Sequence, residues 1–202
     1  MPWLNKNNAS EILSRDPRIA SPTEIRNVFE SQSEQLLWLA GAITGDPTLA
    51  ARCVIDASKL TENNSALFRD WLAQWARNAT VHSALDQMQA QISHAAETSY
   101  ERVRCPHDGH ETLSNGEVAA LEQWPSSELA ACLDPLARAV LILRGVQHAA
   151  IQDCALRLNV SRAAILAAYC HAIDWLSRGT ASLCNEYQPA SVLELAKSLQ
   201  KP

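Results

Sequence analysis

Apolar residues recur at intervals of three and four along most of the chain, which is the spacing of one buried face of an amphipathic α-helix. The pattern predicts long helices over about 24–43, 48–59, 65–96 and 161–178, with shorter ones between them. Ala, Leu, Gln and Glu dominate these stretches, whereas β-branched residues are thinly spread. We therefore expect an all-α fold.

Polar stretches divide this helical pattern into two parts. Residues 21–96 and 117–178 each contain enough apolar positions for a small helical domain, and residues 97–116 between them are polar. We predict two domains joined by a linker at 97–116. Residues 1–20 are expected to form a flexible tail, and residues 179–202 a tail with a short amphipathic helix.

The most specific local pattern is IQDCALRLNVSRAAI at residues 151–165. Asn159 tolerates a positive φ and suits a sharp corner, and Val160 would fill the space between two helices. Ser161 can cap a second helix, whose Ile165 would pack back on the first. This arrangement predicts a helix-turn-helix, and the alternative is an ordinary helical hairpin with a tight corner.

Two tryptophans, Trp71 and Trp75, lie four residues apart within the third long helix. Side chains at this spacing share one helix face, and such a pair belongs more often to a core than to a ligand cage. We predict that both indoles are buried. Exposure of either one would instead indicate a binding face.

Composition limits the classes of function. Apolar residues make up 47% of the chain, and the net charge is −5 with 17 Lys and Arg, so a protein of this charge would bind phosphate backbones weakly. We find no run of 18 apolar residues and no secretory signal at the N-terminus, so we expect a cytoplasmic protein that does not enter membranes. The six cysteines are scattered and form no CxxC pair, which predicts buried thiols.

One short segment carries three side chains that could bind a metal ion. They are Cys105, His107 and His110. This spacing matches no standard zinc pattern, so we interpret the segment as a polar loop, with a metal site as the alternative. No nucleophile motif, phosphate-binding glycine loop or paired-carboxylate helix is present. We therefore expect neither an enzyme nor a cofactor.

Two segments resemble one family in the order that the family requires. Residues 133–144, LDPLARAVLILR, followed by the pattern at 151–165, resemble region 4 of extracytoplasmic-function sigma factors, in which an LPxxxRxVLxLR helix precedes a helix-turn-helix. Residues 68–78, FRDWLAQWARN, resemble the FRxWLxxxARN helix of region 2, and residues 36–47 resemble the segment before it. The chain is thus similar to the sigma-70 family over residues 24–178.

The resemblance implies a protein that binds the RNA polymerase core and promoter DNA during transcription initiation. The region 2-like part would face the promoter or the polymerase through Trp71, Trp75, Arg77 and Asn78. The region 4-like part would contact −35 DNA. Its candidate DNA-binding residues are Arg157, Ser161, Arg162, His171 and Arg178.

Two segments depart from the family pattern. Residues 166–172, LAAYCHA, lack the Lys and Arg that a groove-reading helix uses, and residues 48–57 carry a single acid where the family has an acidic helix that docks on polymerase. We therefore expect weak DNA binding by the isolated protein. The alternative function is a sigma-fold interaction module that binds an anti-sigma factor or another regulator and has lost DNA recognition.

Overall fold

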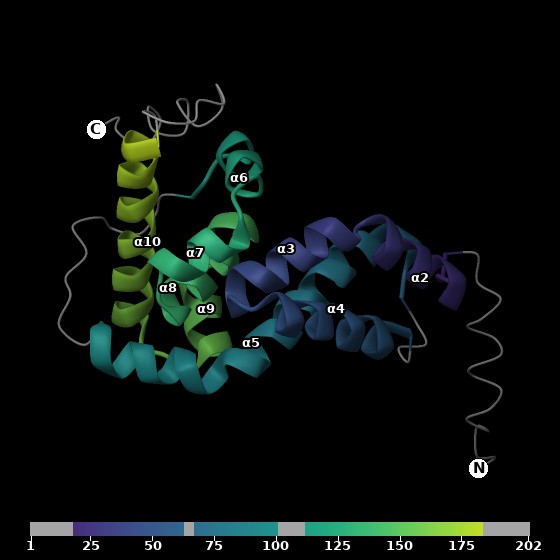
Figure 1. Cartoon of the computed structure of the whole chain (residues 1–202). Coiled ribbons are helices and arrows are strands. Elements are labelled where there is room, and N and C mark those ends of the chain that lie inside the picture. The colour runs from purple at the N-terminus through teal and green to yellow at the C-terminus, as the bar shows by residue number, and fades with distance from the viewer. Residues whose placement is uncertain (1–17, 63–66, 101–111, 184–202) are drawn as a thin grey trace, which may run out of the picture. The chain divides into compact units, whose positions relative to one another are not determined.

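The computed structural model describes residues 18–62, 67–100 and 112–183 (Figure 1). Within these ranges the regular structure is helical, and the one β-type feature is an isolated antiparallel bridge between Ile19 and Phe68. The predicted all-α fold is confirmed for this part of the chain. The chain divides into two compact units, the first formed by Met1–Gly41 and Asp46–Asp86 and the second by Ala42–Gly45 and Gln87–Pro202.

Unit 1 is built from the first helices of the chain. They are α2 (Pro22–Ser31), most of α3 (Ser33–Thr44), α4 (Pro47–Glu62), the 3₁₀ turn η1 (Arg69–Trp71) and the first half of α5 (Leu72–Ser99). The start of α2 is a capping box, as its sequence suggests. Glu24 N–H donates to Ser21 Oγ at 3.3 Å, and Ser21 N–H donates to the Glu24 carboxylate at 2.9 Å.

The predicted helix over 24–43 is wrong in its continuity, because α2 and α3 are separate helices. The break lies at Gln32, whose backbone leaves the helical region at φ −106° and ψ 10°. Three polar residues, Ser31, Gln32 and Ser33, stand there in a row, and Ser31 Oγ donates to the carbonyl of Val28 at 3.1 Å. Side chains that bond the backbone in this way compete with the helical ladder.

The core of unit 1 lies between α3, α4 and the first half of α5. Its fully buried members include Leu36, Leu39, Cys53, Ala57, Val81 and Ala84. Two polar links join elements at its edge: Arg69 pairs with Glu24 at 2.6 Å, and Arg77 donates to Gln35 Oε1 at 2.6 Å. The Arg69 pair holds η1 against the start of α2.

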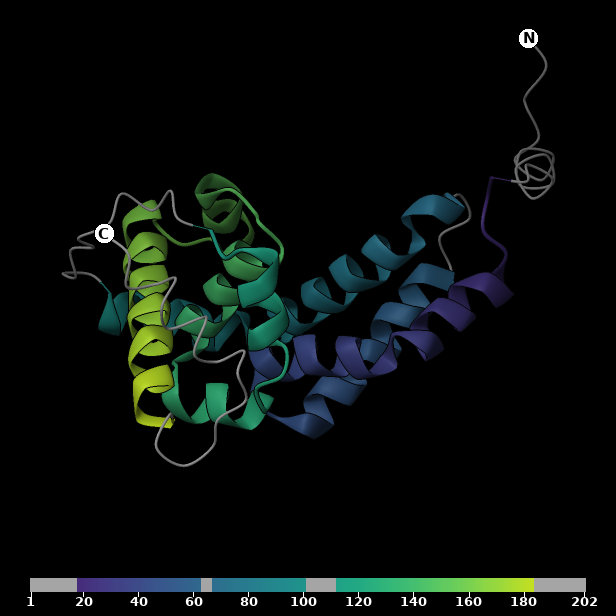
Figure 2. The same cartoon turned by 90° about the horizontal axis from the view of Figure 1, so that it is seen from above.

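The described part of unit 2 contains the second half of α5 and six further elements. These are α6 (Asn115–Leu121), α7 (Ser126–Cys132), α8 (Pro135–Val140), the π-helix η2 (Leu141–Val146), α9 (Ile151–Leu158) and α10 (Arg162–Leu183). Figure 2 shows α8, α9 and α10 gathered in this unit, where α10 packs on both of the others. Trp124, just after α6, meets Trp175 of α10 edge to face at 5.1 Å between ring centroids.

The centre of unit 2 is the segment from α8 into η2. Asp134 caps α8 by accepting from Leu136 N–H at 2.9 Å and Ala137 N–H at 3.1 Å, as the Asp-Pro start predicts. Every residue from 136 to 145 is buried. In η2 the backbone hydrogen bonds span five residues instead of four. Gln147 N–H, for example, donates to the carbonyl of Ile142 at 2.9 Å.

Two arginines lie inside this buried segment. Arg138 donates to the carbonyls of Ala130 at 3.2 Å and Leu133 at 3.4 Å, at the end of α7. Arg144 donates to the carbonyl of Ala149 at 3.1 Å and lies over the Tyr169 ring, 5.8 Å from its centroid. Burial lowers the pKa of the Arg138 guanidinium, and the carboxylate of Asp134 opposes that shift. Both cations are thus held by carbonyls and an aromatic ring inside the unit.

The predicted domain limits of 21–96 and 117–178 remain predictions. The division into compact units falls after Asp86, inside α5, rather than at the end of that helix. Residues 101–111 of the predicted linker lie outside the described residues, as do the tail segments 1–17 and 184–202. The helix α10 continues to Leu183, past the predicted end at 178.

Gly45, between α3 and α4, has a φ of +72° and faces a tight space in unit 2. A Cβ at this position would lie 2.9 Å from Ala130 Cβ and 3.1 Å from an Arg138 guanidinium nitrogen. We expect Gly45→Ala to lower the free energy of unfolding by about 1–3 kcal/mol, through backbone strain and this clash.

Gly116 in α6 is the matched control, because a Cβ there meets nothing within 4 Å. Gly116→Ala should leave stability unchanged or raise it by roughly 0.5–1 kcal/mol, since alanine favours a helix interior. Chemical denaturation of the two variants measures both effects. Equal stabilities for the two variants would contradict the assignment of strain to Gly45.

Candidate nucleic-acid interface

The corner between α9 and α10 has the geometry of a helix-turn-helix. Asn159 takes the left-handed conformation at φ 52° and ψ 46°, and Val160 N–H donates to the carbonyl of Ala155 at 3.1 Å. Ser161 caps α10 by accepting from Ala164 N–H at 3.2 Å. The predicted corner at Asn159 and the predicted cap by Ser161 are confirmed, whereas DNA binding by Ser161 remains a prediction.

The side chains beneath this corner form a dry contact between the two helices. Cys154 and Leu158 of α9 and Ile165 of α10 are fully buried. Burial raises the pKa of the Cys154 thiol to about 11, so this group stays protonated at neutral pH. Val160, which was expected to fill the interhelical core, is only half-buried.

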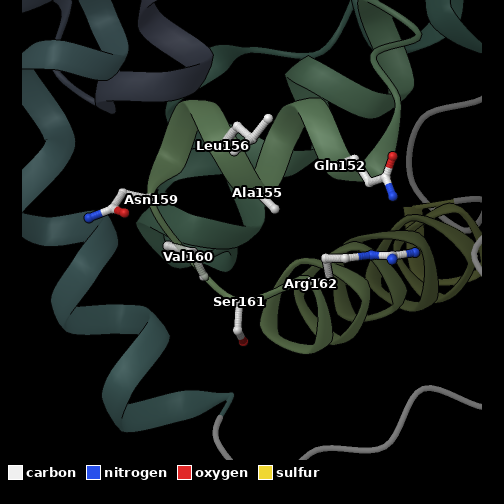
Figure 3. Close-up of a pocket in the computed structure, with 7 residues that line it drawn as sticks. All are labelled: Gln152, Ala155, Leu156, Asn159, Val160, Ser161 and Arg162. Atoms are coloured by element: carbon white, nitrogen blue, oxygen red, sulfur yellow. The ribbon is translucent and has the colours of Figure 1, made fainter.

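An open hollow lies over the corner between α9 and the start of α10. Figure 3 shows the side chains that line it: Gln152, Ala155, Leu156, Asn159, Val160, Ser161 and Arg162. Leu156 is 81% exposed, more than any other large apolar side chain among the described residues. The hollow is therefore lined by both apolar and polar side chains, among them Leu156 and Arg162.

The predicted DNA-binding residues do not all share this surface. Arg157, Ser161 and Arg162 are exposed around the corner. His171 follows Arg162 by nine residues, which is about two and a half helical turns, so it points to the opposite side of α10. Its Nδ1 lies 2.8 Å from the hydroxyl of Tyr100 instead. The side chain of Arg178 lies outside the described part of the structure.

The solvent-facing side of α10 offers little to a nucleic acid. Along the middle of one side, at intervals of three and four, lie the exposed or half-buried Ala163, Leu166, Cys170, Asp174 and Ser177, with the exposed Arg162 and His171 at its two edges. None of the five middle side chains is a Lys or Arg, and Asp174 would repel phosphate. Base edges and phosphates are usually bound by several such donors, so the described middle of α10 is poorly suited to read a groove.

The tryptophans of unit 1 are exposed, which corrects the prediction that they are buried. Trp71 is 67% exposed and Trp75 39% exposed, and Phe68 meets Trp71 edge to face at 5.5 Å. The reason is the phase of the helix. The buried face of α5 starts with Leu72 and Ala76, one residue later in each turn, so the indoles lie at its solvent side. We call Phe68, Trp71 and Trp75 the aromatic face.

The other two region 2-like candidates are already engaged within unit 1. Arg77 donates to Gln35 of α3, and Asn78 accepts a hydrogen bond from Gln74 Nε2 at 3.2 Å. Both are half-buried, unlike the aromatic face. The sequence pattern therefore groups four residues that the structure divides into two exposed aromatic side chains, an arginine that joins α5 to α3, and an asparagine bonded within α5.

The cysteine and histidine expectations have separate outcomes. Cys105, His107 and His110 lie outside the described residues, and no group of three metal-binding side chains occurs within the described ranges. Cys53 and Cys154 are buried thiols as expected, whereas Cys132 is exposed and Cys170 is disulfide-bonded. The expectation of uniformly buried thiols is therefore wrong.

Tyr100 is a residue that the sequence pattern missed. It is buried at the end of α5, and its hydroxyl lies between Asp134 and His171. Burial and the hydrogen bond to the Asp134 carboxylate raise its pKa far above the ordinary value for tyrosine. Its partners are 34 and 71 residues away, so no local signal could have indicated them.

Comparisons with protein-family models, with characterised proteins and with solved structures find no match to this chain. None of the described helices is long and apolar enough to cross a membrane.

The exposure of Trp71 leads to a stability prediction. We expect Trp71→Ala to change the free energy of unfolding by less than about 1 kcal/mol, because little of the indole packs against the unit. Leu36→Ala, in the same unit and fully buried, should cost about 2–5 kcal/mol. Denaturation curves measure both free energies of unfolding. If Trp71→Ala lowers stability as much as Leu36→Ala does, the indole is packed against the unit.

The left-handed corner leads to a second prediction. Asn159→Ala should lower stability by about 1–2 kcal/mol, because a Cβ without a local hydrogen-bonding group is strained at this φ. Asn159→Gly should be close to neutral, since glycine adopts the conformation freely. Thermal unfolding of the two variants tests this order, which would reverse if the residue were in an ordinary helical conformation.

Proposed function

We propose that this chain is a sigma-factor-like protein that acts at transcription initiation by binding RNA polymerase and promoter DNA. The observation that carries the proposal is the helix-turn-helix corner, where Arg157, Ser161 and Arg162 are exposed around the start of α10. In proteins with this motif the first residues of the second helix contact base edges and backbone. The resemblance of residues 133–165 to region 4 supports the same assignment.

The aromatic face adds support from unit 1. Unpaired bases stack on exposed aromatic rings, and each stacked base contributes about 1–3 kcal/mol. Phe68, Trp71 and Trp75 present such rings on the segment that resembles region 2. This surface suits the contact with opened −10 DNA that the resemblance implies.

The electrostatics favour DNA binding that depends on polymerase. The chain carries 17 Lys and Arg against 22 Asp and Glu, and two of the arginines, Arg138 and Arg144, are buried. With Arg157, Arg162 and Arg178 as the candidate phosphate contacts, the logarithm of affinity should fall by roughly 2.7 per tenfold rise in salt. Affinity for DNA alone should be no tighter than the non-specific range of about 10⁻⁴–10⁻⁶ M.

A second candidate function is an interaction module that keeps the fold but binds a regulatory protein. The observation that favours it is Leu156, which is 81% exposed in the hollow at the corner. The lack of basic side chains on the described outward face of α10 agrees with it. An apolar hollow of this kind suits one face of a partner helix better than a phosphate backbone.

Binding measurements with and without core polymerase test the proposal. We expect weak binding of the free protein to promoter-sized duplexes, and specific binding once polymerase supplies the remaining contacts. The double variant Arg157→Ala/Arg162→Ala should reduce the polymerase-dependent binding and flatten the salt dependence. Its control is Arg52→Ala, which removes an exposed arginine that pairs with Asp56 on α4.

Two outcomes would contradict the proposal. If the double variant and Arg52→Ala behave alike, the corner is not a DNA contact. If the protein neither binds polymerase nor gains DNA binding in its presence, while Leu156→Asp abolishes capture of one regulatory protein, the interaction module is the correct function.

A further inference from the structure

Three side chains that are far apart in the sequence of unit 2 lie together at one side of α10. Tyr100 directly follows α5, Asp134 caps α8, and His171 lies in the middle of α10. The Tyr100 hydroxyl donates to Asp134 Oδ2 and lies 2.8 Å from His171 Nδ1, and the two outer groups are 3.8 Å apart. This cluster connects the second helix of the helix-turn-helix to two other elements at once.

The protons in the cluster can be assigned from its geometry. A tyrosine hydroxyl has one proton, and that of Tyr100 is directed to the Asp134 carboxylate. The hydroxyl oxygen must therefore accept from His171, so Nδ1 must carry a proton. The pKa of Tyr100 is raised by burial and by Asp134, so the hydroxyl remains protonated near neutral pH.

The two charge states of His171 meet this requirement differently. The imidazolium always has a proton on Nδ1, and it also attracts the Asp134 carboxylate at 3.8 Å. Neutral imidazole carries one proton, on either nitrogen, so only one of its two tautomers completes the bond, and the attraction to Asp134 is lost. Deprotonation thus weakens the cluster in two ways.

The charged groups around His171 come from each element of the cluster. Asp134 faces it from α8 and Tyr100 from the end of α5, and Arg138 of α8 acts on Asp134 electrostatically. On α10 itself, Asp174 follows three residues later and is exposed. Among the described residues, the hydrogen bond and ion pair of His171 are with Tyr100 and Asp134. The charged group within 4 Å of the imidazole among these residues is the Asp134 carboxylate.

We propose that Tyr100, Asp134 and His171 form a pH-sensitive latch that fastens α10 to the start of α8 and the end of α5 and tightens when His171 is protonated. The latch does not depend on the function proposed above, because it holds α10 whatever that helix binds. Asp134 has a double role in it. Its Oδ1 caps α8 while its Oδ2 receives the Tyr100 hydroxyl, so one carboxylate joins the start of α8 to the end of α5.

The direction of the pH dependence follows from the charge of the histidine. An imidazole changes its charge between about pH 5 and pH 8. The protonated form has its partners in the folded protein and lacks them in the unfolded chain, so the contribution to stability is present at the acidic end and is lost as the pH rises.

Thermal unfolding at about pH 5 and about pH 8 tests the latch in the full chain. The side chain of His171 is 47% exposed, so we expect the wild-type midpoint to exceed that of His171→Gln by no more than about 2–4 °C at the acidic pH. His82→Gln is the matched control. His82 also lies 3.0 Å from a carboxylate, Asp86, but it is 75% exposed, against 47% for His171, and its pair lies within one helix, so this variant should keep the wild-type pH dependence.

Tyr100→Phe provides a second test that preserves the buried ring. It removes only the hydroxyl, and we expect it to abolish the pH-dependent difference in hydrogen exchange of the α10 amides, after correction for intrinsic rates. Wild-type α10 should be more protected at about pH 5 than at about pH 8. The proposal is overturned if His171→Gln keeps the full wild-type pH dependence, or if Tyr100→Phe and wild type show the same pH-dependent protection of α10.

Discussion

The burial of residues 136–145 on every side is the constraint on which unit 2 depends. A helix surrounded by protein cannot use the amphipathic pattern of a surface helix, and any charge inside it must find partners there. Arg138 and Arg144 meet this demand through the carbonyls that end α7 and follow η2, and through the ring of Tyr169. The two arginines therefore bond the segment to the end of α7 and to the residues after η2. The helix α10 packs against the same segment.

Features that depend on neighbouring residues could be predicted from the sequence. The caps at Ser21, Asp134 and Ser161 and the left-handed conformation of Asn159 each follow from one side chain and the backbone within a few residues of it. These features placed the helix-turn-helix corner, and with it three exposed candidate residues, before any tertiary contact was known. The all-α class followed from composition and period in the same way.

Features that depend on tertiary packing could not be predicted. The helical period of α5 was clear from the sequence, but the face with the large indoles of Trp71 and Trp75 was predicted to be the buried one. The unit instead buries the smaller Leu72 and Ala76. His171 was grouped with Arg162 because both are polar, although the two side chains point to opposite sides of the helix. Tyr100 was missed because its partners lie in α8 and α10, so only the folded chain shows its role.

The wide turn of η2 bears on how this chain can tolerate changes in length. A π-turn holds one more residue than an α-turn, and here the bond from Gln147 N–H to Ile142 O closes it. If one residue within 141–146 were removed, the backbone there could form ordinary α-helical hydrogen bonds. The side chains of α8 would keep their directions. The same removal within α8 would rotate each side chain that follows it by about 100° and carry Arg144 away from its carbonyl. The bulge is thus the place in the buried segment where a deletion could be absorbed.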